Sequence, residues 1–233
     1  MSLNSENIAQ ILNANWFGSS NAIEISHISI DSRSMQNGVG TLFFALVGPN
    51  NNGHNYIAEL IQKGVRNFVV TAIPDNLKST ANFLVVQNTL EALQKFAGYY
   101  RNLYHFPIIG ITGSNGKTIV KEWLNQLLCD DYTIVRSPRS YNSQIGVPLS
   151  VWQMNEHHSL AIFEAGISKT GEMNHLQKII QPTIGILTNI GEAHSEGFTN
   201  DTEKLLEKIE LFSTELAPKN SPSWSQGKEH LKP

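Results

Sequence analysis

Residues 108–128 read IIGITGSNGKTIVKEWLNQLL, and this stretch decides the fold. Its first part, Ile108 to Thr112, has the pattern of a buried strand. The glycine-rich turn Gly113 to Gly116 follows, and a helix is expected from Lys117 to Leu128. One side of this helix is expected to carry Val120, Leu124, Leu127 and Leu128. A buried strand, a glycine turn and a helix in this order predict a phosphate-binding loop.

The chemistry of this loop favours ATP with Mg²⁺. Glycines let successive N–H groups face an anion, Lys117 supplies a charge for the β- and γ-phosphates, and the Thr118 hydroxyl can hold Mg²⁺. The expected nucleotide-binding residues are Gly113, Ser114, Asn115, Gly116, Lys117 and Thr118. The general P-loop pattern has a glycine where Ile111 stands, so only its second half is present. A glycine turn with an incidental lysine is the structural alternative.

Further strands follow the loop at Thr133 to Val135, Leu160 to Phe163 and Ile184 to Leu187, with helical stretches between them. Strands that are apolar throughout and alternate with helices predict a parallel sheet covered by helices on both faces. The last helix of this unit is expected from Asp201 to Phe212. This half of the chain is therefore predicted to be an α/β nucleotide-binding unit.

The residues before Pro107 predict a separate, smaller α/β unit. Short strands are expected in four apolar stretches, at Ile23 to Ile30, Thr41 to Val47, Phe68 to Val70 and Phe83 to Val86. Helices are expected from Tyr56 to Lys63 and from Asn88, a suitable N-cap with Glu91 three residues later. The predicted domains are 1–105 and 106–212, followed by an irregular tail, 213–233, which has three prolines and no periodicity.

Composition excludes several classes of protein. The 233 residues are 40% hydrophobic and carry a net charge of -3, which gives no basic field for a nucleic-acid backbone. No apolar run approaches the roughly 20 residues that span a bilayer, and Met1 to Gln10 has no leader pattern. The single cysteine, Cys129, cannot form an intramolecular disulfide and is expected to be a small buried residue. We therefore expect a cytoplasmic protein.

The loop segment Gly110-Ile-Thr-Gly-Ser-Asn-Gly-Lys-Thr118 resembles the ATP loop of the Mur ligases, which extend the peptide on a UDP-linked muramic acid. Three further segments resemble that family in the same order. They are Asp31-Ser-Arg33 with Gly38, Leu42 to Leu46 and Gly53-His54; Tyr141 to Leu149; and Thr188 to His194 with Glu196-Gly-Phe198. The resemblance covers about Ile23 to Phe212. It is greatest to the branch that adds D-alanyl-D-alanine to UDP-N-acetylmuramoyl-tripeptide. Ser137 to Tyr141 and Phe163 to Ser168 are similar to the version fused to an alanine racemase.

The resemblance implies an ATP-dependent ligase that forms an acyl phosphate on a carboxylate, which an amine then attacks. It implies Lys117, Lys208 and His194 as catalytic residues, and Thr118, Glu164 and His194 as metal ligands. Glu164 also suits this role by position, because it ends a buried strand at the sheet edge where the loop begins. His194 is the expected ligand of a second Mg²⁺; without its flanking motif it would be read as a solvated loop histidine.

Lys208 stands where Mur ligases carry a lysine that reacts with CO₂ to form a carbamate. Lys204, one turn earlier, competes for this role. The alternative is that both lysines lie on the wet face of an amphipathic helix with Glu203 and Glu207.

Three residues are expected to bind the UDP-muramoyl substrate. Arg33 can bind a diphosphate or carboxylate with two hydrogen bonds, and Ser32 can read a uracil edge. By resemblance, Asn142 lies near the muramoyl group. The family has an acidic residue where Asn52 stands, which leaves the role of that turn open. Structural roles, as turn residues or a loop cap, are the alternative for all three.

Two other functions remain open from the sequence. A ligase similar to folylpolyglutamate synthase shares the ATP loop, although the Asp31-Ser-Arg33 unit speaks against it. A noncatalytic ATP-binding remnant is the second. Complete Mur ligases have a third domain that brings the incoming dipeptide and further strands in the central sheet, so we expect these 233 residues to be an incomplete, inactive part of such an enzyme.

Overall fold

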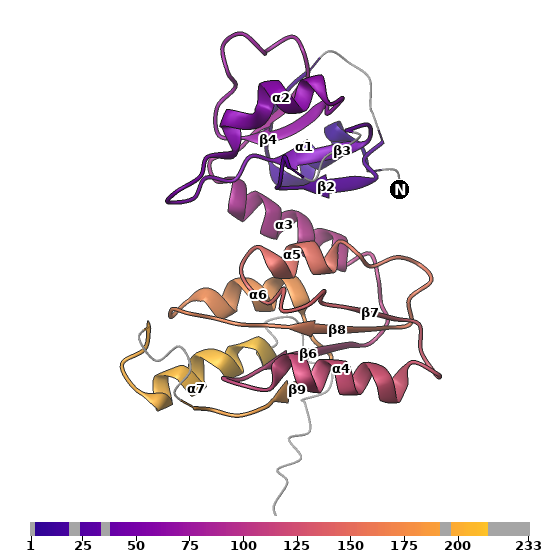
Figure 1. Cartoon of the computed structure of the whole chain (residues 1–233), viewed down its shortest axis with the longest axis vertical. Coiled ribbons are helices and arrows are strands. Elements are labelled where there is room, and N and C mark those ends of the chain that lie inside the picture. Colours follow the sequence, from indigo (N-terminus) through magenta and orange to yellow (C-terminus); the bar gives the residue numbers. More distant parts are fainter. Residues whose placement is uncertain (1–2, 19–23, 34–37, 192–196, 214–233) are drawn as a thin grey trace, which may run out of the picture.

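The computed structural model describes residues 3–18, 24–33, 38–191 and 197–213. They form an α/β protein with two sheets, one of five strands and one of four. Figure 1 shows the two sheets at opposite ends of the molecule, with helix α3 (Thr89–Arg101) between them. The fold class predicted from the sequence is confirmed.

The N-terminal sheet has the order β1-β5-β4-β3-β2, and only β1 runs antiparallel to its neighbour. Its strands are β1 (Asn15–Phe17), β2 (His27–Ser29), β3 (Thr41–Phe44), β4 (Asn67–Val70) and β5 (Asn82–Val85). The remaining helices are α1 (Ser5–Leu12), the 3₁₀ helix η1 (Gly53–Tyr56) and α2 (Ile57–Gln62). Leu42 and Phe44 share a core cluster with α1 and α3, and Phe43 shares one with α2. Alternate side chains of β3 thus bury both faces of the sheet.

The second sheet is entirely parallel, with the order β7-β8-β6-β9. In chain order its elements are β6 (Ile108–Thr112), α4 (Lys117–Leu128), β7 (Ile134–Arg136), α5 (Gly146–Val151), β8 (Leu160–Glu164), α6 (Glu172–Ile180), β9 (Ile184–Leu187), α7 (Asp201–Ile209) and the 3₁₀ helix η3 (Glu210–Phe212). Ile109 and Ile111 pack against α4, whereas Ile108 packs in a cluster with α5 and α6. Helices therefore cover both faces, as predicted.

Helix α3 joins the two sheets by packing against both. Asn88 caps it as predicted, accepting hydrogen bonds from the N–H groups of Leu90 and Glu91. Farther along, Tyr100 lies 4.5 Å from the ring of Trp152, which follows α5, and Gln94 donates a hydrogen bond to Gln144 at 2.9 Å. These contacts place the middle and the end of α3 against the helical side of the second unit.

Several elements differ from the predictions. Neither α1 nor β1 is predicted, and the strands expected at Ile23 to Ile30 and Thr41 to Val47 are shorter, as β2 and β3. Leu127 is 75% exposed, although it was predicted to lie on the same side of α4 as Val120, Leu124 and Leu128. Those three pack against the strands β6 and β8, whereas Leu127 lies outside this cluster. Cys129 is exposed, not buried, because α4 ends beside it.

None of the helices in the described part of the chain has the length and hydropathy to span a bilayer. Residues 214–233 of the predicted tail lie outside the described residues, as does Ile23. The limits of the predicted domains stay a prediction.

Candidate functional site

The loop Gly113 to Gly116 leaves β6 at its carboxyl end and leads directly into α4. Gly113 has φ +141° and Gly116 has φ +82°, conformations that L side chains rarely adopt. A Cβ on Gly113 would lie 2.0 Å from the Thr188 hydroxyl. Glycine is therefore required here by both backbone and space, and the N-terminal N–H groups of α4 are presented at the edge of the sheet.

The segment after β9 holds this loop in place. The N–H of Ser114 donates to the carbonyl of Asn189 at 2.8 Å, and the N–H of Asn115 donates to the Asn189 side chain at 2.8 Å. The Ser114 hydroxyl donates to the carbonyl of Gly191 at 3.1 Å and accepts from its N–H at 3.0 Å. Two of the expected nucleotide-binding residues are thus fixed by a motif more than 70 residues away in sequence.

Three lysines gather at the loop and at the segment after β9 that holds it. The Lys117 ammonium donates to the carbonyls of Gly113 at 2.7 Å and Ser114 at 3.2 Å. From α7, Lys208 donates to the carbonyl of Gly113 at 3.2 Å, and Lys204 donates to the carbonyl of Gly191. Lys204 and Lys208 are each 1% exposed, so the alternative that they lie on a wet helix face is wrong. Buried cations gathered at a helix N-terminus form an anion-binding environment.

The lysine pKa values respond to this burial. Burial, and then the neighbouring Lys117 and Lys204, lower the pKa of Lys208 to about 8. Burial also lowers the pKa of Lys117, whereas the Glu164 carboxylate opposes that change. The neutral amine form of Lys208 is therefore more accessible near neutral pH than that of a solvated lysine.

Glu164 reaches the loop because β8 pairs with β6 in a register that places Glu164 opposite Ile111. Its Oε2 accepts hydrogen bonds from the Thr118 hydroxyl at 3.0 Å and from the Asn142 amide at 3.4 Å. A hydroxyl and a carboxylate oxygen are hard donors of the kind that Mg²⁺ prefers. Their proximity fits the Mg²⁺ site expected at Thr118 and Glu164. Among the described residues, no group of three or more His, Cys, Asp or Glu side chains could hold a metal ion, so phosphates and water would complete such a site.

Lys121 is the residue of this region that the sequence prediction missed. It is fully buried, and its ammonium lies 2.9 Å from Oε1 of Glu164. The sequence offers one signal for it, which is that Lys121 stands four residues after Lys117 and so lies on the same face of the predicted helix. In the sequence it is one of several lysines next to glutamates, so nothing local distinguishes a buried lysine from a solvated one.

A cavity of about 300 Å³ opens beside the loop and collects the predicted residues from several elements. Lys117, Asn142 and Lys208 line it together with Leu90 from the beginning of α3 and Glu172 from α6. Its wall therefore includes a residue of α3, the helix that packs against both sheets. The cavity unites residues predicted separately to bind nucleotide, muramoyl substrate and CO₂.

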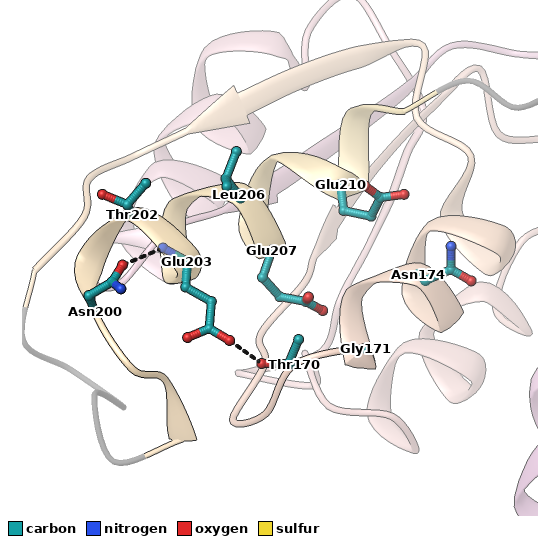
Figure 2. A pocket seen from close by; sticks show the side chains of 9 residues that line it. All are labelled: Thr170, Gly171, Asn174, Asn200, Thr202, Glu203, Leu206, Glu207 and Glu210. Atoms are coloured by element: carbon teal, nitrogen blue, oxygen red, sulfur yellow. Dashed lines mark hydrogen bonds between the residues drawn. The ribbon is translucent and has the colours of Figure 1, made fainter.

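A wider cavity of about 630 Å³ lies between α6 and α7 (Figure 2). Three of its lining residues are glutamates, and Figure 2 shows Glu203 bound to the Thr170 hydroxyl, at 3.1 Å. Glu207 accepts a hydrogen bond from the N–H of Met173 at 3.0 Å. None of the residues that line it is a lysine or arginine, which makes it a poor phosphate site.

The predicted Asp31-Ser-Arg33 site lies in the N-terminal unit, directly after β2. The Arg33 guanidinium pairs with the Asp31 carboxylate at 2.8 Å, and this pairing lowers the pKa of Asp31 to about 2. Ser32 is buried, and its carbonyl accepts a hydrogen bond from Lys63 at 3.2 Å. Nearby, His54 is held between the Asn52 side chain and the N–H of Thr71. Arg33 is exposed and accessible to an anion, whereas Ser32 is enclosed.

His194, expected as a catalytic residue and metal ligand, lies outside the described residues. Of the motif that contains it, the structure describes Thr188 to Gly191, and Gly191 contacts Ser114. The role of His194 stays a prediction.

Two family models match the chain. The Mur ligase middle domain matches residues 111–221, and the Mur ligase family catalytic domain matches residues 24–101. The UDP-N-acetylmuramoyl-tripeptide–D-alanyl-D-alanine ligase of Rickettsia prowazekii is 35% identical over 193 residues, which are 83% of this chain and 42% of that protein. The chain spans 37% to 51% of the curated relatives it matches, about half of their length or less.

Solved structures agree with these matches. A crystal structure of MurF from Acinetobacter baumannii aligns with a TM-score of 0.83 at 28% identity, covering 91% of this chain and 46% of that one. MurF ligase from Thermotoga maritima, in complex with ADP, aligns with a TM-score of 0.72 at 27% identity, covering 79% of this chain and 42% of that one.

Proposed function

The chain belongs to the Mur ligase family and is a MurF homologue that covers the N-terminal and middle domains, and from that premise we propose that it binds UDP-N-acetylmuramoyl-tripeptide and ATP for the addition of D-alanyl-D-alanine. The convergence of Lys117, Glu164 and Lys208 on one loop carries this proposal. Relatives named for the same reaction support it. The reaction is a step of peptidoglycan synthesis, and its nucleotide-linked precursor is expected in the cytoplasm.

We assign the UDP-muramoyl peptide to the unit 1–105 and ATP to the unit 106–212. Within the second unit, the N–H groups of the loop 113–118 and the Lys117 ammonium would bind the phosphates. The similarity to the Thermotoga protein, which is in complex with ADP, supports nucleotide binding by this chain. Arg33 is the cation of the Asp31-Ser-Arg33 turn suited to the diphosphate, and Ser32, being enclosed, would contribute through its backbone.

Thr118 and Glu164 would hold Mg²⁺, with His194 as a ligand of a second ion. When bound, Mg²⁺ supplies charge neutralisation for the phosphates. The chain itself does the positioning: Asn142 and the Thr118 hydroxyl orient Oε2 of Glu164 before any ion arrives. An oriented carboxylate loses little freedom on binding a cation, which favours the bound state.

The reaction proceeds in two displacements. An oxygen of the tripeptide's terminal carboxylate attacks the γ-phosphorus of ATP, and the bond from this phosphorus to ADP breaks. The amine of D-alanyl-D-alanine then attacks the acyl carbon, loses a proton, and releases inorganic phosphate. Lys117 lies where it can stabilise the charge that develops on the transferred phosphoryl group.

Lys208 is the better of the two lysines for a carbamate. It lines the cavity with Lys117 and Asn142, and its pKa of about 8 leaves a neutral amine to attack CO₂. Carbamate formation also replaces a buried cation by an anion between Lys117 and Lys204, which relieves the repulsion among the three ammonium groups. Labelling with ¹³C-bicarbonate should give a carbamate NMR signal that Lys208→Met removes and Lys204→Met retains.

Nucleotide binding is tested by calorimetric titration of the protein with Mg²⁺ and a nonhydrolysable ATP analogue. Lys117→Ala should weaken binding about 10- to 100-fold, the range for a lost hydrogen bond to a charged group. Lys178→Ala, an exposed lysine on α6, is the matched control and should bind like the wild type. Equal affinity in all three proteins would contradict the phosphate-binding role of the loop.

For the 233 residues alone we propose binding without amide formation, since relatives named for the reaction are about twice as long. Holding two reactants in line supplies on the order of 7 to 11 kcal/mol of such a barrier, and each missing contact removes part of it. The chain is incubated with ATP, Mg²⁺, UDP-muramoyl-tripeptide and D-alanyl-D-alanine, and the pentapeptide product is followed by mass spectrometry. Product that Lys117→Ala abolishes would overturn this part of the proposal.

A further inference from the structure

Lys121 is a charged residue near the loop that is as fully buried as Glu164. Its side chain is 0% exposed, on the side of α4 that faces the end of β8. The ammonium donates to the carbonyl of Ser137 at 2.8 Å and to the carbonyl of Arg139, and it lies 3.1 Å from the Glu122 carboxylate. Its fourth contact is Oε1 of Glu164, at 2.9 Å. None of the roles proposed above involves it.

The contacts of Lys121 make the two oxygens of Glu164 unequal. Oε1 is buried, and it accepts no well-angled hydrogen bond from the described residues, so the Lys121 ammonium is its electrostatic partner. Oε2 points the other way, toward the Thr118 hydroxyl and the Asn142 amide. The N–H of Glu164 donates to the Ser137 hydroxyl at 3.1 Å, which fixes the backbone as well. The carboxylate is thus held with one oxygen facing inward and one facing the loop.

This arrangement decides how Glu164 can bind a cation. Mg²⁺ is small and takes an octahedron of single oxygens, whereas the larger Ca²⁺ readily takes both oxygens of one carboxylate. With Oε1 engaged by Lys121, only Oε2 is available on the loop side. We infer that Lys121 is a positioning residue that restricts Glu164 to one-oxygen coordination and thereby sets the preference of the site for Mg²⁺ over Ca²⁺.

The inference rests on the proposed ATP and Mg²⁺ site, and it differs from a purely structural role. Removing one partner of a buried ion pair destabilises a fold, because the other charge is left buried and unpaired. A structural Lys121 would therefore change the melting temperature, and with it binding of all nucleotide complexes alike. A positioning Lys121 changes the ratio of affinities measured with the two cations.

The experiment measures the affinity for a nonhydrolysable ATP analogue with Mg²⁺, with Ca²⁺ and with EDTA, in the 233-residue protein and in Lys121→Met and Lys121→Gln. Methionine fills the space without charge, and glutamine retains a donor that is too short to reach Glu164. The wild type should bind more tightly with Mg²⁺ than with Ca²⁺, and both variants should reduce this ratio tenfold or more. Lys178→Met, on the exposed side of α6, should keep the wild-type ratio.

The outcomes separate the two proposals. If the wild type binds the analogue no better with Mg²⁺ than with EDTA, the proposed function fails at its cation site and the inference fails with it. If the wild type prefers Mg²⁺ and the variants keep that ratio, the proposed function stands and the role of Lys121 is overturned.

Infrared spectra of the wild type give a test that needs no Lys121 variant. The band of the Glu164 carboxylate is identified by subtracting the spectrum of Glu164→Gln from that of the wild type. It should show one-oxygen coordination with both cations, and a two-oxygen pattern would overturn the inference.

Discussion

The two polar regions predicted to bind substrates are built in opposite ways. The Asp31-Ser-Arg33 turn is held by contacts between neighbours, since Arg33 binds a carboxylate two residues away and its side chain is 88% exposed. The loop 113–118 is held by residues 46 to 95 positions away, among them Glu164, Asn189 and Lys208. The comparison shows that one site is formed by a short peptide segment and the other only by the complete second sheet.

This difference has an electrostatic consequence. Ion pairs in solvent are screened and contribute little, so the turn can change charge at small cost. Charged side chains around the loop are buried, and each is stabilised by a specific partner of opposite charge or by a carbonyl. A buried charge that loses its partner keeps the full cost of desolvation. Substitutions around the loop should therefore have large effects, and those in the turn small ones.

Gly113→Ala should have the largest effect. The new Cβ would lie 2.0 Å from the Thr188 hydroxyl and 3.0 Å from the N–H nitrogen of Asn189, at φ +141°. The loop must move away from the segment that holds it, so affinity for the ATP analogue should fall at least 100-fold by calorimetry.

The matched control is Gly171→Ala, at the beginning of α6. Gly171 also has a positive φ, +86°, but a Cβ there would meet no atom within 4 Å. It should lose only about 1–2 kcal/mol of stability from the left-handed backbone, with nucleotide affinity unchanged. If the two variants bind the analogue equally, the tight contact with Thr188 does not shape the site.

Lys208 should give the next largest effect, seen in the pH dependence of stability. Its pKa is lowered to about 8 in the folded protein, whereas in the unfolded chain it is near 10.5. Between these values the unfolded chain binds more protons, so the free energy of unfolding should rise with pH, by at most about 1.4 kcal/mol per pH unit. Lys208→Met should be the more stable protein near pH 7, and its advantage should shrink from pH 8 toward 10.5.

Urea unfolding between pH 7 and 10 in bicarbonate-free buffer measures this difference. The exposed-lysine variant Lys178→Met should follow the wild-type curve at every pH. A constant gap between wild type and Lys208→Met across the range would show that Lys208 is solvated in the folded protein.

The sequence predicted the parts of both regions that depend on local pattern. The glycine turn between β6 and α4, the Asn88 cap and the alternation of strands and helices are set by neighbours in sequence, and the structure contains all three. Lys121, Lys204 and Lys208 could not be placed in this way. A lysine beside glutamates on a helix has the same pattern whether its face meets water or another element, and only the packed sheet decides.

Asp31→Asn should give the smallest effect, and it tests the exposed side of the comparison. The Arg33 side chain, first through its hydrogen bonds, lowers the pKa of Asp31 to about 2. A depressed carboxyl pKa contributes stability above the unfolded value of 3.8 and loses it as pH falls through 2, so the whole contribution is present at pH 7. Because both side chains lie in solvent, the free energy of unfolding should nevertheless fall by no more than about 0.5 kcal/mol in urea unfolding at pH 7, and this loss should vanish in 1 M salt.

Asp75→Asn, another exposed aspartate in the same unit, serves as the control. A loss for Asp31→Asn that exceeds 1.5 kcal/mol and persists in salt would mean that the turn, like the loop, depends on enclosed charge, because screening acts only on pairs that water reaches.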